Sequence, residues 1–338
     1  MITYPHLKKG ATIGVTAPSS GVPPQLHEIL KLACSRMEQR GFKVNCGETA
    51  WTQNKAKSAP ALKRAAEFNT MMCDNEIDIL IPPWGGELLI ETLKHIDFEN
   101  IKNKWVLGYS DISGLLLAIT LKTGIATAHG TNIVDLRGEF MDETTAMWQS
   151  VLSTNKGESV IQPSSEKYQK EWQHTNPSPC VFHLTEQTAW NTVGNRPVRI
   201  QGRLLGGCID IIRHLIGTPF GDVEKFRKQH INGEPVIWYL ENCGMNTADL
   251  RRSLVQMRLA GWFENCSGLM FGRSDANRSV ENYTVEDVYQ DLAAELDIPI
   301  IYDIDCGHLP PQITFINGAY GEVEVSERKG TVLQFFRP

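Results

Sequence analysis

Short apolar runs alternate with longer stretches of helical periodicity along the first third of the chain. The runs have the length of buried strands, and the stretches between them repeat their apolar positions every three or four residues. Strands are expected over 11–18, 42–46, 77–81 and 105–108, and helices over 24–40, 60–72 and 112–122. This alternation predicts right-handed crossovers and a parallel sheet that is covered on both faces. Residues 1–150 are therefore expected to form an open, flavodoxin-like α/β domain.

The pattern changes between about residue 144 and residue 196, where neither helical nor strand periodicity extends over a long segment. We therefore expect a linker with an irregular flap over 151–196. Regular patterning then returns. Strands are expected over 198–205, 236–240, 268–271 and 299–302, and helices over 208–216, 247–260 and 285–295. The final segment alternates with period two, which predicts a β-hairpin around Lys329-Gly330. Residues 197–338 are expected to form a second α/β domain that ends in this hairpin.

Composition narrows the class of protein. The chain has 338 residues, of which 41% are hydrophobic and 21% are charged, a balance that suits two globular domains. The formal net charge of -6 gives no general attraction to phosphate backbones or anionic lipids, so neither nucleic acid nor membrane is an expected partner. The first residues lack the apolar run of a signal peptide, and no segment has the length of a membrane span. We expect a cytoplasmic enzyme.

The eight cysteines are scattered, and none forms a Cys-x-x-Cys pair. A chain of this size does not need disulfides to stabilise its core. The thiols are therefore expected to be reduced, and a structural zinc site is not expected.

The sequence Gly108-Tyr-Ser110-Asp111 places a serine between a buried strand and a helix. Ligands of open α/β sheets gather beyond the carboxyl ends of the strands, and a serine there can act as a nucleophile. The free N–H groups at the start of the following helix can stabilise an oxyanion. Serine is also a favoured helix N-cap, so the motif alone is equally compatible with a structural role.

A glycine turn, Trp84-Gly-Gly-Glu87, follows the third predicted strand. Adjacent glycines let backbone amides approach a ligand, so the N–H groups of Gly86 and Asp111 are candidate oxyanion donors. A plain glycine-rich turn explains the motif equally well. The spacing lacks the Walker A pattern, which argues against a phosphate-binding loop.

Glu241 and His308 each follow a predicted strand of the second domain, within Leu240-Glu-Asn242 and Asp305-Cys-Gly-His308. A histidine there can act as the general base that a neutral serine needs, and a carboxylate from a neighbouring strand can orient it. Taken separately, a loop histidine and a solvated strand-end carboxylate explain the same residues.

Together these motifs resemble the LD-carboxypeptidase and microcin C immunity family of serine peptidases, in which Gly-Tyr/Phe-Ser-Asp, Glu and Gly-His occur in this order. The resemblance covers nearly the whole chain and includes the segments 11–20, 127–130, 202–207 and 306–310. It implies Ser110 as nucleophile, His308 as base and then acid, Glu241 as orienter, and the amides of Gly86 and Asp111 as oxyanion donors. It further implies an active site in the cleft between the domains, no metal, no cofactor and a homodimer.

Two departures set the chain apart from the peptidoglycan-recycling branch of that family. Gly85-Gly86 is followed by Glu87 where that branch usually carries Tyr-Gly, and Thr314-Phe-Ile-Asn-Gly318 stands where that branch usually has Pro-Leu/Ile-Gly after the histidine. The Gly-Gly-Glu turn and the long flap with Trp172 and Trp190 indicate a different branch. Both features are nearer to the microcin C immunity branch, where a flap aromatic stacks on a nucleobase. We therefore expect substrate contacts from Gly85, Glu87 and one of the two tryptophans.

A carboxypeptidase site also needs a cation for the free carboxylate of its substrate. Arg273 or Arg203 can supply it through bidentate pairing. Either arginine can equally have a structural role.

The resulting hypothesis is a serine peptidase that forms an acyl-enzyme. Its substrate is either a murein tetrapeptide or an aminoacyl or peptidyl nucleotide of the microcin C kind. Two alternatives remain: a non-catalytic protein of the same fold that binds a peptide or nucleotide, and an esterase that uses the same triad.

Overall fold

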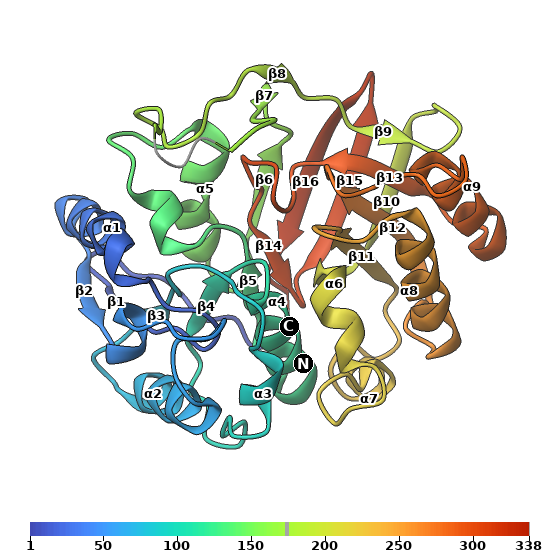
Figure 1. Cartoon of the computed structure of the whole chain (residues 1–338). Coiled ribbons are helices and arrows are strands. Elements are labelled where there is room, and N and C mark those ends of the chain that lie inside the picture. Colours follow the sequence, from blue (N-terminus) through green and yellow to red (C-terminus); the bar gives the residue numbers. More distant parts are fainter. Residues whose placement is uncertain (173–175, 338) are drawn as a thin grey trace.

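The computed structural model describes residues 1–172 and 176–337, and two sheets organise this part of the chain (Figure 1). The first sheet has six strands in the order β14-β5-β4-β3-β1-β2. Strands β1 to β5 are parallel and follow the flavodoxin order 2-1-3-4-5, as predicted. Their bounds are Thr12–Val15 for β1, Lys43–Cys46 for β2, Ile79–Leu80 for β3, Trp105–Gly108 for β4 and Thr127–His129 for β5.

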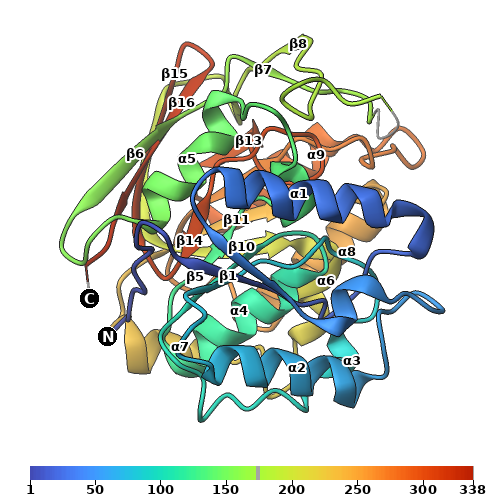
Figure 2. The ribbon, with the colours of Figure 1, turned by 90° about the vertical axis from the view of Figure 1, so that its left-hand side faces the viewer.

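Helices cover both faces of the first sheet, and α1 and α2 lie on opposite sides of β1 (Figure 2). The helices of this half are α1 (His27–Gln39), α2 (Ala61–Cys73), α3 (Ile90–Leu93), α4 (Ile112–Thr123) and α5 (Glu143–Leu152), with short 3-10 segments at Pro24–Leu26, Glu48–Trp51 and Ile133–Leu136. Helix α4 is apolar on all sides and buried from Ile112 to Leu121, because it also packs against the second sheet.

The second sheet has eight strands in the order β6-β16-β15-β10-β11-β12-β13-β9, of which β10 to β13 are parallel. Their bounds are Ser159–Pro163 for β6, Asn191–Thr192 for β9, Val198–Cys208 for β10, Val236–Glu241 for β11, Cys266–Gly272 for β12, Ile300–Ile304 for β13, Tyr320–Ser326 for β15 and Lys329–Phe335 for β16. The helices here are α6 (Ile209–Ile212), α7 (Val223–His230), α8 (Thr247–Leu259) and α9 (Val285–Leu296), with a 3-10 segment at Arg213–Leu215.

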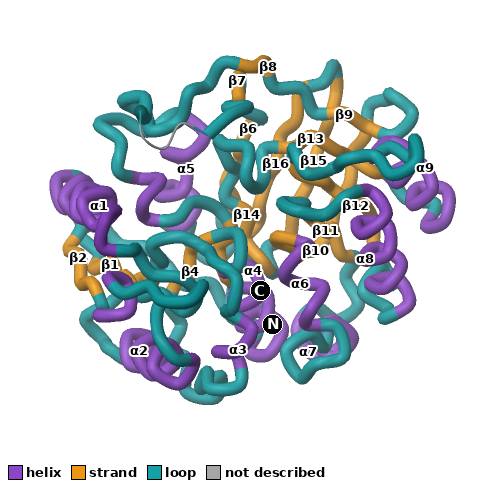
Figure 3. The backbone as a smooth tube through the Cα atoms, in the orientation of Figure 1, coloured by secondary structure: helices purple, strands orange, loops and turns teal. Residues whose placement is uncertain are grey.

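Between α5 and β10 the backbone is mostly loop, as the flap prediction expected (Figure 3). It contains the small hairpin of β7 (Lys167–Tyr168) and β8 (Glu186–Gln187) together with β6 and β9, which join the second sheet. Within residues 1–172 and 176–337, no helix combines the length and apolar character that crossing a membrane requires.

Several details differ from the sequence prediction. Helices α3, α5 and α7 and strand β5 were not predicted, and the tail hairpin turns at Glu327 and Arg328, with φ of 51° and 62°, rather than at Lys329-Gly330. In addition, β14 (Phe315–Asn317) lies near the end of the chain but pairs antiparallel with β5 of the first sheet. The C-terminal half therefore contributes a strand to the N-terminal sheet and fastens the two halves together.

Candidate active site

Ser110 lies in the tight turn between β4 and α4, at the carboxyl edge of the first sheet. Its φ is +63°, a left-handed conformation that costs free energy for any residue with a Cβ. A strand–turn–helix elbow of this kind lifts a nucleophile above the sheet edge. Ser110 is not the N-cap of α4, because Asp111 occupies that position and the Ser110 side chain does not cap the helix.

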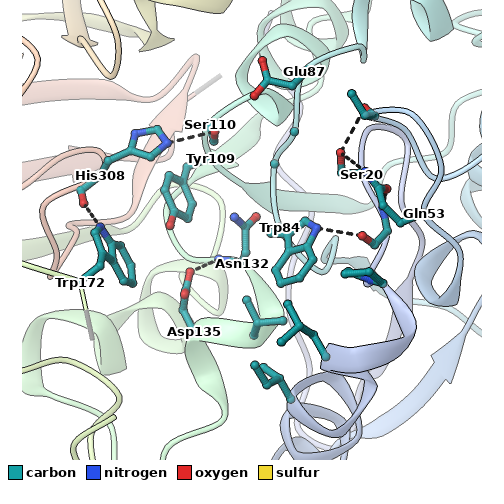
Figure 4. Close-up of a pocket in the computed structure, with 18 of the residues that line it drawn as sticks. Ser20, Gln53, Trp84, Glu87, Tyr109, Ser110, Asn132, Asp135, Trp172 and His308 are labelled. Carbon is teal, nitrogen blue, oxygen red and sulfur yellow. Dashed lines mark hydrogen bonds between the residues drawn. The ribbon is translucent and has the colours of Figure 1, made fainter. Parts of the chain in front are cut away.

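The three predicted triad residues meet at this edge, and Figure 4 shows two of them, Ser110 and His308, joined by a hydrogen bond. His308 Nε2 lies 3.0 Å from Ser110 Oγ, and His308 Nδ1 lies 3.0 Å from the Glu241 carboxylate. Glu241 is fully buried at the end of β11, whereas His308 retains 34% of its side-chain exposure toward a cavity. Nδ1–H donates to the carboxylate in this arrangement, which leaves Nε2 free to accept the serine proton.

The charges of the pair shift both pKa values. Burial disfavours the imidazolium of His308, but the charge of Glu241 and its hydrogen bond outweigh burial and raise the pKa of His308 to about 9. Burial likewise opposes the Glu241 carboxylate, yet His308 holds the pKa of Glu241 below its ordinary value. Glu241 therefore stays charged and stabilises a protonated His308.

A second histidine near the triad is not a candidate base. His129 ends β5 and is completely buried, with its ring 5.5 Å from that of Tyr239 and 6.5 Å from that of Tyr109. Burial lowers the pKa of His129 to about 4, so the ring is neutral. It packs beneath the site rather than facing Ser110.

The glycine turn lies directly against the nucleophile. A Cβ on Gly85 would stand 2.6 Å from Ser110 Oγ and 3.0 Å from the Asp111 nitrogen, so a side chain has no room there. Gly86 has a φ of +146°, and its Cβ would stand 2.3 Å from Ser20 Oγ. Within the described residues, the N–H groups of Gly86 and Asp111 donate no hydrogen bond. The turn thus brings backbone close to Ser110, as the motif predicted.

The Asp111 side chain has a role that sequence reasoning missed. Its carboxylate accepts hydrogen bonds from the Ser19 hydroxyl and, at 2.9 Å, from the Leu89 N–H. Burial raises the pKa of Asp111, while these hydrogen bonds oppose the rise. The carboxylate therefore ties the first strand's loop and the segment after the glycine turn to the nucleophile.

A further contact joins the nucleophile helix to the second sheet. The Cys208 N–H, at the end of β10, donates to Ser113 Oγ at 3.0 Å. A Cβ on Gly207 would stand 2.6 Å from the Ser113 Cβ, so β10 approaches α4 at closest range here. Together with the β14–β5 pairing, this contact fixes Ser110 relative to Glu241 and His308.

A cavity of about 570 Å³ opens beside Ser110 and His308. Figure 4 shows Trp84 and Trp172 on opposite sides of Tyr109, with Asn132 and Asp135 between them. Trp84 donates its indole N–H to the Gly21 carbonyl, and Trp172 donates its own to the His308 carbonyl at 2.8 Å. Both tryptophans are thus held in place at the wall of the cavity. Gly85, Gly86, Glu87 and Arg137 also line it.

Trp190 and Arg273 are not substrate contacts, which corrects two predictions. Trp190 is fully buried, and its indole N–H donates to Asp305 Oδ2 at 2.8 Å. Arg273 is 4% exposed, forms an ion pair with Asp305 Oδ1 at 2.8 Å, and stacks over the Tyr168 ring. The buried Asp305 carboxylate therefore engages both side chains.

Arg203 has a structural role as well. It is 2% exposed, pairs with Glu234, and donates to the Tyr4 hydroxyl and the Gly318 carbonyl. Arg137 is the arginine that lines the cavity of about 570 Å³, and none of the predicted motifs contains this residue.

A second cavity, of about 530 Å³, shares Gly86, Glu87, Ser110 and His308 with the first and extends on their other side. Asp210, His214 and Cys243 line its far end. No sequence motif singled out these three residues, because they lie in three different segments: α6, the 3-10 segment Arg213–Leu215 and the loop after β11. The two cavities meet at Ser110, so a substrate can extend from the nucleophile in two directions.

Comparison with known proteins places this site in a family. The LD-carboxypeptidase N-terminal domain matches residues 13–130, and the LD-carboxypeptidase C-terminal domain matches residues 201–323. A probable murein peptide carboxypeptidase of Bacillus subtilis is 25% identical over 96% of this chain and 92% of its own length. The microcin C7 self-immunity protein of Escherichia coli is 22% identical over 91% of this chain and 89% of its own length.

The fold agrees with these relatives. The structure of the microcin C7 self-immunity protein in complex with glutamyl sulfamoyl guanosine superimposes with a TM-score of 0.84, at 17% identity, and covers 100% of both chains. The identities to the murein and microcin relatives are too similar to separate the two branches. The matched domains, their order and the full-length fold together show that this chain belongs to the LD-carboxypeptidase family of peptidases.

Proposed function

We propose that the protein is a serine hydrolase that cleaves an amide bond through an acyl-enzyme, with Ser110 as nucleophile, His308 as base and Glu241 as orienter. The observation that carries the proposal is the continuous hydrogen-bond chain from Ser110 Oγ through the His308 ring to the buried Glu241 carboxylate, with both links at 3.0 Å. A serine that only caps a helix needs neither of these partners.

The steps follow from this geometry. His308 Nε2 takes the proton of Ser110 as Oγ attacks the substrate carbonyl, and Glu241 stabilises the imidazolium that forms. The imidazolium then protonates the leaving nitrogen, the C–N bond breaks, and an ester joins the acyl group to Ser110. Water, deprotonated by His308, hydrolyses this ester and restores the free serine.

The N–H groups of Gly86 and Asp111 would stabilise the tetrahedral oxyanion. Two features support this assignment. A Cβ on Gly85 would stand 2.6 Å from Ser110 Oγ and 3.0 Å from the Asp111 nitrogen, so the glycine turn and the Asp111 N–H lie beside the nucleophile. The N–H groups of Gly86 and Asp111 also lack an acceptor within the described residues. Donors aimed at a developing negative charge contribute the largest single share of catalysis in many enzymes of this type.

For the substrate, we favour an aminoacyl or peptidyl nucleotide over a murein tetrapeptide. The first cavity offers indole rings from Trp84 and Trp172, and stacking on an aromatic side chain stabilises a base by about 1–3 kcal/mol. Arg137 supplies a cation in the same cavity for an anionic linker. The related self-immunity protein has been solved with glutamyl sulfamoyl guanosine, which is a molecule of this class.

Parallel hydrolysis assays test the proposal. The wild type and Ser110→Ala would be given an aminoacyl sulfamoyl adenosine, an L,D-linked murein tetrapeptide and an ester analogue of the better substrate. Faster amide cleavage of the nucleotide, lost in the variant, is expected. Preference for the tetrapeptide would overturn the substrate assignment, preference for the ester would favour an esterase, and tight binding without cleavage would favour a binding protein.

A further inference from the structure

Cys208, Asp210 and Cys243 converge at the far end of the second cavity. Cys208 is the last residue of β10, Asp210 lies in α6 directly after it, and Cys243 follows β11 by two residues. Because β10 and β11 are parallel neighbours, with Cys208 in register with Glu241, residues 35 positions apart come together at one sheet edge. Their ligand atoms all lie within 4.8 Å of one another.

The separations match those that a tetrahedral zinc ion imposes. Zn–S bonds of about 2.3 Å and Zn–O bonds of about 2.0 Å hold two sulfurs about 3.8 Å apart and a sulfur and an oxygen about 3.5 Å apart. Here the two Sγ atoms are 3.6 Å apart, and Cys208 Sγ lies 3.6 Å from Asp210 Oδ2. A disulfide would instead require the sulfurs to approach to about 2.05 Å.

Hydrogen bonds already fix the orientation of the Asp210 carboxylate. The N–H groups of Cys243 and Gly244 donate to Asp210 Oδ2 and Oδ1 at 2.9 and 3.0 Å, so the ligand set needs little rearrangement to receive an ion. These two hydrogen bonds leave further lone pairs on the carboxylate oxygens for coordination.

The electrostatic surroundings favour a cation. Glu87, Asp111 and Asp210 line this cavity together with His214 and His308, and the described residues contribute no lysine or arginine to its wall, so acidic groups outnumber the basic ones. Asp210 and Cys243 both face the cavity, so a bound ion would keep an open coordination position on that side for water.

We infer that Cys208, Asp210 and Cys243 form a binding site for a thiolate-preferring divalent cation such as Zn²⁺, and that its occupancy inhibits hydrolysis. On binding, each thiol releases its proton to solvent as the S–Zn bond forms, so affinity rises with pH. Inhibition follows from position, because the ion enters the cavity that Ser110 and His308 line. The inferred metal-binding site does not depend on the proposed function, whereas the inhibition of hydrolysis rests on it.

The candidate ligands also lie next to the triad. Cys208 is in register with Glu241 on the neighbouring strand β11, so an ion bound here would stand beside the residue that orients His308. Occupancy of the site therefore changes the surroundings of the triad as well as the cavity.

Cobalt and zinc titrations of the reduced, metal-free, full-length chain test the inference. Co²⁺ is expected to bind one ion per chain with thiolate charge-transfer absorbance in the near ultraviolet and d–d bands of tetrahedral strength in the visible range. Zn²⁺ should displace Co²⁺, and the charge-transfer and d–d absorbance should then disappear. Cys243→Ser should weaken binding on the order of 100-fold and reduce the charge-transfer band. Asp210→Asn, whose amide keeps one acceptor oxygen, provides a second variant if Cys243→Ser folds poorly.

Cys34→Ser is the matched control, because Cys34 and Cys46 form another close thiol pair, with their Sγ atoms 3.3 Å apart on α1 and β2. This variant should bind as the wild type does. Absence of binding, or bands that survive Cys243→Ser and vanish in Cys34→Ser, would overturn the site.

Hydrolysis is measured separately, as the rate with Zn²⁺ divided by each variant's own metal-free rate. Loss of activity in the wild type at one equivalent of Zn²⁺, with much weaker loss in Cys243→Ser, is expected. Cobalt binding with undiminished hydrolysis would overturn the inhibition. A chain that binds cobalt but cleaves no substrate would count against the proposed function and not against the site.

Discussion

The first sheet positions the proposed nucleophile, Ser110, through the conformation of the backbone, whereas the second sheet positions Glu241 and His308 through their charges. Ser110 has a left-handed backbone conformation, and Gly85 lies so close to it that a side chain at position 85 would not fit. Glu241 ends β11 and His308 lies in the loop after β13, and the pair is held by burial, an ion pair and a hydrogen bond. Substitutions in the first sheet should therefore act through sterics and be insensitive to pH, whereas those in the second should alter the pH dependence.

The largest effect is expected at the nucleophile. Ser110→Ala removes the attacking oxygen and should lower kcat by at least about 10⁴-fold. Stopped assays at high enzyme concentration measure it, and thermal unfolding checks the fold. A variant that keeps a tenth of the wild-type rate would exclude Ser110 as nucleophile.

Glu241→Gln should come next, because it keeps the shape but removes the charge that orients and stabilises His308. A loss in kcat on the order of 10⁴-fold is expected, by analogy with the same change in other serine triads. The remaining activity should depend on pH at lower values than in the wild type, since the main cause of the raised His308 pKa is gone. An unshifted profile would show that Glu241 does not act on the base.

Gly85→Ala tests the steric side of the comparison. Its methyl group would meet Ser110 at 2.5–2.6 Å, so the elbow must shift, and a loss on the order of 100-fold in kcat is expected with no shift in the pH profile. Gly157→Ala is the control, because its φ is +90° but its Cβ would meet nothing within 4 Å. That control should lower stability alone. Equal kinetic losses in both variants would refute the close-approach argument.

The pH profile of the wild type tests the electrostatic side. Only neutral His308 can accept the serine proton, and its pKa is raised to about 9, so kcat/KM should increase with pH across the range from neutral to about 9. Between pH 7 and pH 9 the gain is about 50-fold, since the neutral fraction of His308 rises from about 1% at two pH units below its pKa to about half at the pKa. A plateau that begins near pH 6.5 would contradict the strong coupling to Glu241.

The smallest expected effects come from the two tryptophans of the flap, Trp172 and Trp190. Trp172→Ala should raise KM about 5- to 150-fold for a nucleotide substrate, which corresponds to the loss of about 1–3 kcal/mol of stacking, and should leave stability nearly unchanged. Trp190→Ala should instead lower the free energy of unfolding by about 3–5 kcal/mol, because it empties a buried site. Calorimetry and initial rates separate the two. A reversed pattern would show that the ligand contacts were assigned to the wrong tryptophan.

The sequence was sufficient to predict the features that depend on local pattern. The flavodoxin order followed from alternating strands and helices. The candidate triad followed from the order of three short motifs and from the family resemblance that this order carries, and the structure brings Ser110, His308 and Glu241 within hydrogen-bond distance. The left-handed Ser110 turn is a local property of the same kind.

The features that depend on long-range burial were not predictable. Trp190 and Arg273 are typical ligand-binding residue types, but the buried Asp305 carboxylate engages both. Nothing in the sequence near 190 or 273 indicates that partner. Similarly, Cys208 and Cys243 have no recognisable metal-ligand spacing, since parallel pairing of β10 and β11 brings them together.

The most direct test of the central claim is covalent labelling with a fluorophosphonate, read by intact mass and peptide mapping. The wild type should gain one phosphonyl group, located on Ser110, and labelling should be at least 100-fold slower in His308→Ala and Glu241→Gln, as expected if the base activates the serine. Labelling at another residue, or equal rates in all three proteins, would contradict a nucleophile supplied by one sheet and activated by the other.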